Sequence, residues 1–180
     1  MRQLFIIYLL MNVFTYTKGV NAAIRTQIIE WSNKNQEYLR LIYDGDIFRA
    51  QGTAFGDCIS KVEYLIEMIF TEPQYFRGVQ TLDGRLQAGA IIDDYSSYLY
   101  IDAITNVLWN VIKNQPQTVK GAATSLVEGI IQESIEMGYQ GRLRLITIER
   151  AKSFYKGIGF VEDEDSSGGM ELTPVAAEFF

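Results

Sequence analysis

Apolar positions in the first part of the chain recur at the spacing of one face of a helix. Between Ala22 and Tyr43 they recur at loosely helical spacing, which predicts a first helix. A second apolar stripe runs from Ile59 to Ile69 and predicts a second helix. We expect Asp57 to cap this second helix, because a short acidic side chain can accept hydrogen bonds from the N–H groups of the first turn.

The middle of the chain has the pattern of strands. Residues 74–81 and 85–92 flank Leu82-Asp83-Gly84, where the Asp-Gly pair predicts a two-residue hairpin turn. Residues 98–105 are rich in β-branched and aromatic side chains and predict a third strand. We therefore expect an antiparallel meander after the two helices.

The segment from Gln117 to Gly138 starts with small residues and continues as a helix with one apolar face. Residues 142–148 then alternate as a strand, 149–157 form a short helix, and 169–173 provide a last strand. The order strand, helix, strand across residues 98–148 implies a crossover connection. The predicted fold class is therefore mixed α/β, with a parallel pair inside a mostly antiparallel sheet.

Composition narrows the classes of function. The chain has 180 residues, 48% of them apolar and 21% charged, as in an ordinary globular domain. Its net charge is −6, and residues 160–180 carry six acidic and no basic side chains. No basic stripe is present, so we expect no nucleic-acid partner.

The chain has no histidine and a single cysteine, Cys58. These counts exclude an intramolecular disulfide and Ser–His or Cys–His catalysis, and we expect no metal site. Acid–base chemistry must come from Asp, Glu, Lys or Tyr. We interpret Cys58 as a small core residue rather than a nucleophile.

Residues 1–22 form an apolar N-terminal segment, and residues 23–180 form the predicted domain. The apolar run from Leu4 to Met11 is too short to span a bilayer, so we expect no membrane partner. Arg2 ahead of the run and the small residues near Ala22 are compatible with a secretory signal. The alternative is a first strand or helix of the domain, which agrees with a cytoplasmic protein.

Two stretches carry a resemblance to a known family. "TVKGAATSLV", residues 118–127, and "ERAKSFYKGIGF", residues 149–160, together with the element order, resemble the GNAT superfamily of acetyl-CoA-dependent N-acetyltransferases. Residues 108–126, 138–145 and 171–180 further resemble an uncharacterised subgroup of these enzymes. The family's pyrophosphate loop reads Gln/Arg-x-x-Gly-x-Gly/Ala; Gly121 and Ala123 match, whereas Thr118 replaces the leading residue. The resemblance implies a GNAT-like acyl-CoA N-acyltransferase fold, with helices flanking the sheet.

The start of the helix after Gly121 fits this resemblance physically. Backbone N–H groups at a helix N-terminus, together with the helix dipole, favour an anion such as the diphosphate of acetyl-CoA. Lys120 would add a positive charge. The alternative is that the small residues are packing spacers and Lys120 is an ordinary surface lysine.

The second stretch matches the family motif Asn-x-x-Ala-x-x-φ-Tyr with Ala151, Phe154 and Tyr155, although Ile148 stands where the motif has asparagine. By resemblance, Tyr155 would protonate the thiolate of CoA. The alternative is a partly buried tyrosine that supports its helix. For the general base, Asp102 is the first candidate, because a buried carboxylate beside aromatic side chains would have a raised pKa; the alternative is a hydrogen-bonded aspartate at the end of its strand. Glu149 is the second candidate, and its alternative is a first-turn acid that interacts with the helix dipole.

The residues that the resemblance assigns to the cofactor are Ile104, Thr105, Asn106, Thr118, Val119, Lys120, Gly121, Ala122, Ala123, Thr124, Ile148, Ala151, Phe154 and Tyr155.

The predicted function is transfer of an acetyl group from acetyl-CoA to a primary amine, of a small molecule or a peptide, by direct attack. A homodimer is one possible assembly. The alternative function is a catalytically inactive binding module of the same fold. Asp44, Asp46 and Asp57, between and within the first two helices, hint at a cationic acceptor.

Overall fold

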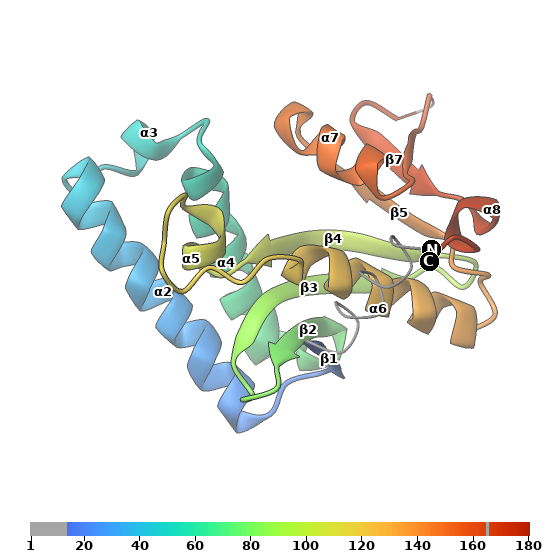
Figure 1. Cartoon of the computed structure of the whole chain (residues 1–180), viewed down its shortest axis with the longest axis horizontal. Helices are drawn as coiled ribbons and strands as arrows, with labels where there is room; N and C mark the ends of the chain where they lie inside the picture. The colour runs from blue at the N-terminus through green and yellow to red at the C-terminus, as the bar shows by residue number, and fades with distance from the viewer. Residues whose placement is uncertain (1–13, 165) are drawn as a thin grey trace. The chain divides into compact units, whose positions relative to one another are not determined.

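The computed structural model describes residues 14–164 and 166–180, so most of the predicted N-terminal segment 1–22 lies outside the described residues. The chain divides into two compact units, unit 1 with Met1–Ile91 and Ala103–Ser125, and unit 2 with Ile92–Asp102 and Leu126–Phe180. Figure 1 shows the course of the chain through both. Each unit is described by itself below.

The described strands are β1 (Phe14–Lys18), β2 (Phe76–Thr81), β3 (Leu86–Asp94), β4 (Leu99–Asn106), β5 (Leu143–Ile146), β6 (Val161–Glu162) and β7 (Gly169–Leu172). They follow the hydrogen-bonded order β1-β2-β3-β4-β5-β7-β6. β4 and β5 are parallel, whereas β1–β2, β2–β3, β5–β7 and β6–β7 are antiparallel. The mixed α/β class with a mostly antiparallel sheet and one parallel crossover is confirmed.

Both predicted helices of unit 1 are present. α2 (Ala22–Tyr43) and α4 (Ala54–Thr71) lie side by side (Figure 1), with the short α3 (Ile47–Ala50) between them in sequence. The predicted cap of α4 is wrong: the helix begins three residues before Asp57, and the Thr53 hydroxyl accepts a hydrogen bond from the N–H of Gly56 at 3.0 Å. A threonine in this position satisfies an N–H group that the first turn leaves without an intrahelical acceptor.

The core of unit 1 forms where α2 and α4 face the strands. Ile28 and Trp31 from α2, Leu65 from α4 and Phe76 from β2 belong to one buried cluster. Cys58 belongs to the same cluster and is 2% exposed, which confirms its interpretation as a core residue. Burial of these large apolar side chains fixes the helix pair against the meander.

The hairpin between β2 and β3 differs from the predicted two-residue turn. Gly84 donates its N–H to the carbonyl of Thr81 at 2.8 Å, so Leu82 and Asp83 are the central residues of the turn. Gly84 follows at φ 80°, in the left-handed region. This is a three-residue loop. Gly84 is its third residue and adopts a positive φ at little steric cost, so it follows the two central residues of the turn instead of being one of them.

The described helices after the meander are α5 (Leu108–Val111), α6 (Ala122–Glu136), α7 (Glu149–Gly157) and α8 (Pro174–Ala177). The helices starting near residues 122 and 149 match the prediction, whereas α3, α5 and α8 were not predicted because each is a single turn. In unit 2, the buried apolar residues include Leu145 of β5, Met170 of β7 and Phe160. In residues 14–164 and 166–180, no helix combines the length and the apolar character that crossing a membrane requires.

Candidate cofactor site

The turn that precedes α6 ends at Gly121, which lies in unit 1 and adopts a φ of 88°. The carbonyl of Gly121 accepts the N–H of Ser125 at 2.9 Å, so Gly121 is the residue from which the helix starts. The geometry of an α-helix therefore leaves the N–H groups of Gly121, Ala122, Ala123 and Thr124 without intrahelical acceptors. Lys120, beside them, is exposed.

The two residues before Lys120 use their backbone donors within the protein. The N–H of Thr118 donates to the carbonyl of Gln115 at 3.2 Å, and the N–H of Val119 donates to Oδ1 of Asn110 at 2.7 Å. These bonds narrow the sequence prediction, because an anion at this turn would meet the N–H groups of residues 120–124 and not those of Thr118 and Val119.

The end of β4 carries a second feature that suits a ligand. Ile104 and Thr105 have buried side chains, and Asn106 follows them at the last position of the strand. The carbonyl of Asn106 accepts hydrogen bonds from the Thr105 hydroxyl at 3.1 Å and from the Cys58 thiol at 3.5 Å. Within the described part of the chain, however, Oδ1 of Asn106 is buried and has no hydrogen-bond partner.

An unpaired buried acceptor is rare, because a lost hydrogen bond to water is expensive. A ligand with N–H groups would satisfy Oδ1 of Asn106. The pantetheine arm of CoA contains two amide N–H groups, so this atom fits the cofactor that the sequence predicts. The unpaired oxygen and the open N–H groups after Val119 both lie in unit 1.

The tyrosine motif lies in unit 2, on α7. Tyr155 is 4% exposed, and its ring packs edge-on against Phe154 at 5.1 Å and Phe160 at 5.5 Å between ring centroids. Burial raises the pKa of the Tyr155 hydroxyl, because the apolar surroundings disfavour a charged phenolate. Ala151 is half-buried on the same helix, and Ile148, which precedes the helix, is exposed and makes no side-chain cap.

Asp102 belongs to unit 2 and differs from its prediction. We expected a buried carboxylate, but the side chain of Asp102 is exposed. The reason is strand alternation: Leu99, Ile101 and Ala103 point into the core, so Asp102 points to the other face with Tyr100. The two groups interact, since burial and then the charge of Asp102 raise the pKa of Tyr100.

Glu149, the second candidate for the base, is also exposed and forms an ion pair with Lys152 at 2.9 Å. The acidic residues after α2 have structural roles: Asp44 pairs with Arg49, and Oδ1 of Asp46 accepts the N–H of Phe48 at 2.9 Å and so caps α3. These contacts weaken the reading of Asp44 and Asp46 as a binding site for a cationic acceptor.

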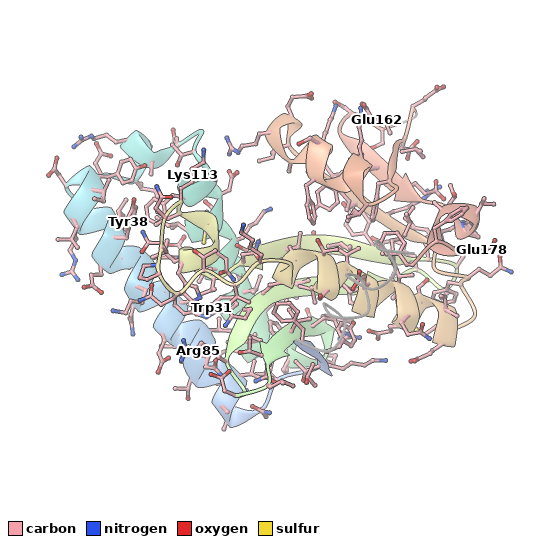
Figure 2. All side chains as sticks on the ribbon, in the orientation of Figure 1. Trp31, Tyr38, Arg85, Lys113, Glu162 and Glu178 are labelled. Carbon is pink, nitrogen blue, oxygen red and sulfur yellow. The ribbon has the colours of Figure 1, made fainter. Side chains whose placement is uncertain are left out.

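Unit 1 also contains a cleft of about 870 Å³ that the sequence did not predict. Its walls come from α2, from the β2–β3 turn and from the loop after β4; Figure 2 labels three of its lining residues, Trp31, Tyr38 and Arg85. Trp109 of α5 lines it as well. None of the predicted cofactor residues lines this cleft.

Gln87 is a residue that the sequence analysis missed. Gln87 is buried in β3, and it bonds Trp109 and Asn110, which in turn bonds Val119. One signal was available: Gln87 is a polar residue inside the apolar run 86–92. Such a residue must find hydrogen-bond partners when it is buried.

No family model and no curated protein matches this chain. Solved structures do match. The N-acetyltransferase PaiA from Thermoplasma acidophilum, crystallised with coenzyme A, is 16% identical over 89% of this chain and 98% of its own, with a TM-score of 0.54. A GNAT-family acetyltransferase from Listeria monocytogenes is 16% identical over 88% of this chain and 92% of its own, with a TM-score of 0.53.

This chain has the GNAT fold. A third match, the ribosomal-protein-S18-alanine N-acetyltransferase from Escherichia coli, agrees, with 15% identity over 88% of this chain and 92% of its own and a TM-score of 0.52. The resemblance stated from the two sequence motifs is thus confirmed for the fold. At these identities, the likeness concerns the GNAT fold and leaves the chemistry of the site to be argued from the residues.

Proposed function

We propose that this GNAT-fold chain is an N-acetyltransferase that transfers the acetyl group of acetyl-CoA to a primary amine. The observation that carries the proposal is the start of α6. There, a glycine at φ 88° leads into a helix whose first N–H groups lack intrahelical acceptors, beside the exposed Lys120. Such a terminus suits a diphosphate.

In the proposed reaction, the amine nitrogen attacks the thioester carbonyl directly, so that a C–N bond forms as the C–S bond breaks. The products are an N-acetyl amine and the free thiol of CoA, and the proton that the amine loses balances the proton that the thiolate gains. Acetyl-CoA supplies an activated acyl group, so the chain needs no nucleophile of its own. This agrees with the absence of histidine and with the burial of Cys58.

We assign separate roles in binding and proton transfer to individual residues. The N–H groups of residues 120–124 hold the diphosphate, and Lys120 adds charge. Oδ1 of Asn106 accepts an amide N–H of the pantetheine arm, next to Ile104 and Thr105. Asp102, which is exposed, takes a proton from the amine, directly or through water.

Tyr155 is proposed as the group that stabilises the leaving thiolate, on the strength of its motif. An ordinary phenol has a pKa of about 10 and an ordinary thiol one of about 8.5, so full proton transfer to sulfur is uphill. Burial raises the pKa of Tyr155 and makes that transfer harder. We therefore propose that Tyr155 donates a hydrogen bond to the sulfur and keeps its own proton.

Calorimetric titration with CoA tests the proposal. We expect saturable binding with one site per chain, together with release of free thiol when acetyl-CoA is supplied with small amines, polyamines and peptide N-termini as acceptors. An absence of binding at millimolar CoA would refute the proposed acetyltransferase activity. Binding without turnover of any acceptor would favour the inactive binding module.

Location and assembly follow from this proposal. We propose a cytoplasmic location, because acetyl-CoA is an intracellular compound. The proposed partners are the acceptor amine, free or peptide-borne, and neither nucleic acid nor a membrane. Homodimerisation stays a prediction.

A further inference from the structure

A buried glutamine anchors the loop that leads to the turn before α6. Gln87 of β3 is 1% exposed, and its Oε1 accepts hydrogen bonds from Nε1 of Trp109 at 3.2 Å and from Nδ2 of Asn110 at 3.1 Å. Its backbone carbonyl accepts the N–H of Val107 at 3.0 Å. The donors are Val107, which follows β4, and Trp109 and Asn110, which belong to α5.

Asn110 links Gln87 to the turn before α6. Its Nδ2 donates to Gln87, while its Oδ1 accepts the N–H of Val119 at 2.7 Å. A second bond runs beside it, because the hydroxyl of Thr118 donates to the carbonyl of Trp109 at 2.7 Å. Two consecutive residues of α5 thus hold the two consecutive residues that precede Lys120.

The chemistry of this chain of bonds admits one orientation of each amide. The N–H of Val119 needs an acceptor, so Asn110 presents its oxygen there and its NH₂ group towards Gln87. The indole N–H of Trp109 can only donate, so Gln87 must present its oxygen to both neighbours. Exchanging the oxygen and the NH₂ group of either side-chain amide would place two donors opposite each other.

We propose that Asn110, held by Gln87, is a positioning residue for cofactor binding: it fixes Val119 so that the N–H groups of residues 120–124 are presented together to the diphosphate of CoA. This inference rests on the proposed function and adds to it. Preorganised donors bind an anion more tightly than mobile ones, because the ligand does not have to order the turn. Neither Asn110 nor Gln87 has to touch the cofactor.

The test compares Asn110→Ala with the wild type in binding CoA and pantetheine, which shares the thiol arm of CoA but lacks its diphosphate. We expect the Kd for CoA to rise about 10-fold, in line with the loss of one hydrogen-bonded tether, and the Kd for pantetheine to stay within about 2-fold. Asn33→Ala, the same truncation at an exposed position of α2, serves as the matched control and should leave both values unchanged.

A second measurement needs no ligand. In the wild type, the amide proton of Val119 should exchange slowly with solvent, since it is bonded to Asn110; in Asn110→Ala it should exchange faster, while amides in the middle of α4 keep their protection. Trp109→Phe removes the indole donor and part of the ring but keeps the bond from Asn110 to Val119, and it should give a smaller rise in the Kd for CoA.

The outcomes separate the inference from the proposed function. A wild-type chain that fails to bind CoA refutes the proposed function and this inference with it. A wild type that binds CoA, with an equal Kd in Asn110→Ala, overturns the inference alone. Equal loss of CoA and pantetheine binding in Asn110→Ala also overturns it, because the residue then supports the fold in general and not the diphosphate turn.

Discussion

Replacing Tyr155 with phenylalanine tests the role of the buried phenol more directly than any other single change. The substitution keeps the ring and its edge-on contacts with Phe154 and Phe160, so it leaves no large cavity. It removes only the hydroxyl, whose pKa burial raises. Near neutral pH we expect the free energy of unfolding to change by no more than about 1 kcal/mol.

The magnitude at high pH follows from linkage. Below a pH of about 10, the usual pKa of a phenol, Tyr155 is protonated in both the folded and the unfolded chain and contributes no pH dependence. Above that pH the unfolded chain loses this proton while the folded chain keeps it. The unfolding free energy of the wild type should then fall by up to about 1.4 kcal/mol per pH unit because of Tyr155, and Tyr155→Phe should lack this part of the slope.

Urea unfolding of both proteins at about pH 8 and about pH 11 measures the difference, because every other titrating group is shared. Parallel loss of stability in the two proteins would refute the reasoning. In the enzyme assay, Tyr155→Phe should lower kcat by about 100-fold, because the developing thiolate loses a hydrogen-bond donor. The matched control Tyr95→Phe, at a side chain that is 55% exposed, should keep wild-type turnover; undiminished turnover in Tyr155→Phe would remove that residue from the mechanism.

Three further changes test the geometry. Gly121→Ala places a side chain at φ 88° and should destabilise the turn by about 1–2 kcal/mol and weaken CoA binding, measured by urea unfolding and calorimetry, whereas Gly157→Ala, without a positive φ, should do neither. Thr53→Ala should lower the unfolding free energy by about 1 kcal/mol, because the N–H of Gly56 loses its acceptor; no change would mean that the cap is unimportant. Cys58, whose pKa burial raises, should react with a thiol reagent in denaturant and not in the native protein, and rapid native labelling would contradict its burial.

The larger elements of the fold could be predicted because their signals are local. Apolar spacing predicted α2 and the stripe of α4, the Asp-Gly pair and the β-branched and aromatic content predicted the meander, and alternation predicted β5. The predictions were wrong for a helix cap and for a hairpin turn, where the choice among a few neighbouring residues decides the local structure. The cap of α4 lies at Thr53 and not at Asp57, and the β2–β3 turn centres on Leu82 and Asp83, because several nearby residues can serve each of these purposes.

The candidate site was predictable in part for the same reason. A glycine followed by small residues before an apolar stripe indicates an accessible helix start, and Gly121 has the positive φ that this requires. The environment of Asp102 was not predicted correctly, since sharing a strand face with tyrosines does not decide whether that face is covered. The resemblance assigned Asn106 to the cofactor, but the sequence could not show that its Oδ1 lacks a hydrogen-bond partner, because that is a property of its surroundings.

The sequence by itself determined which chemistry is open to this protein: without histidine and with one cysteine, it must act through Asp, Glu, Lys, Tyr and its backbone. It also determined the order of the longer helices and strands, because each of these depends on a pattern carried by its own residues. Only the tertiary structure decided which backbone donors are open to a ligand. That choice depends on bonds such as those from Asn110 to Gln87 and Val119, which join residues 23 and nine positions apart, and no local pattern records them.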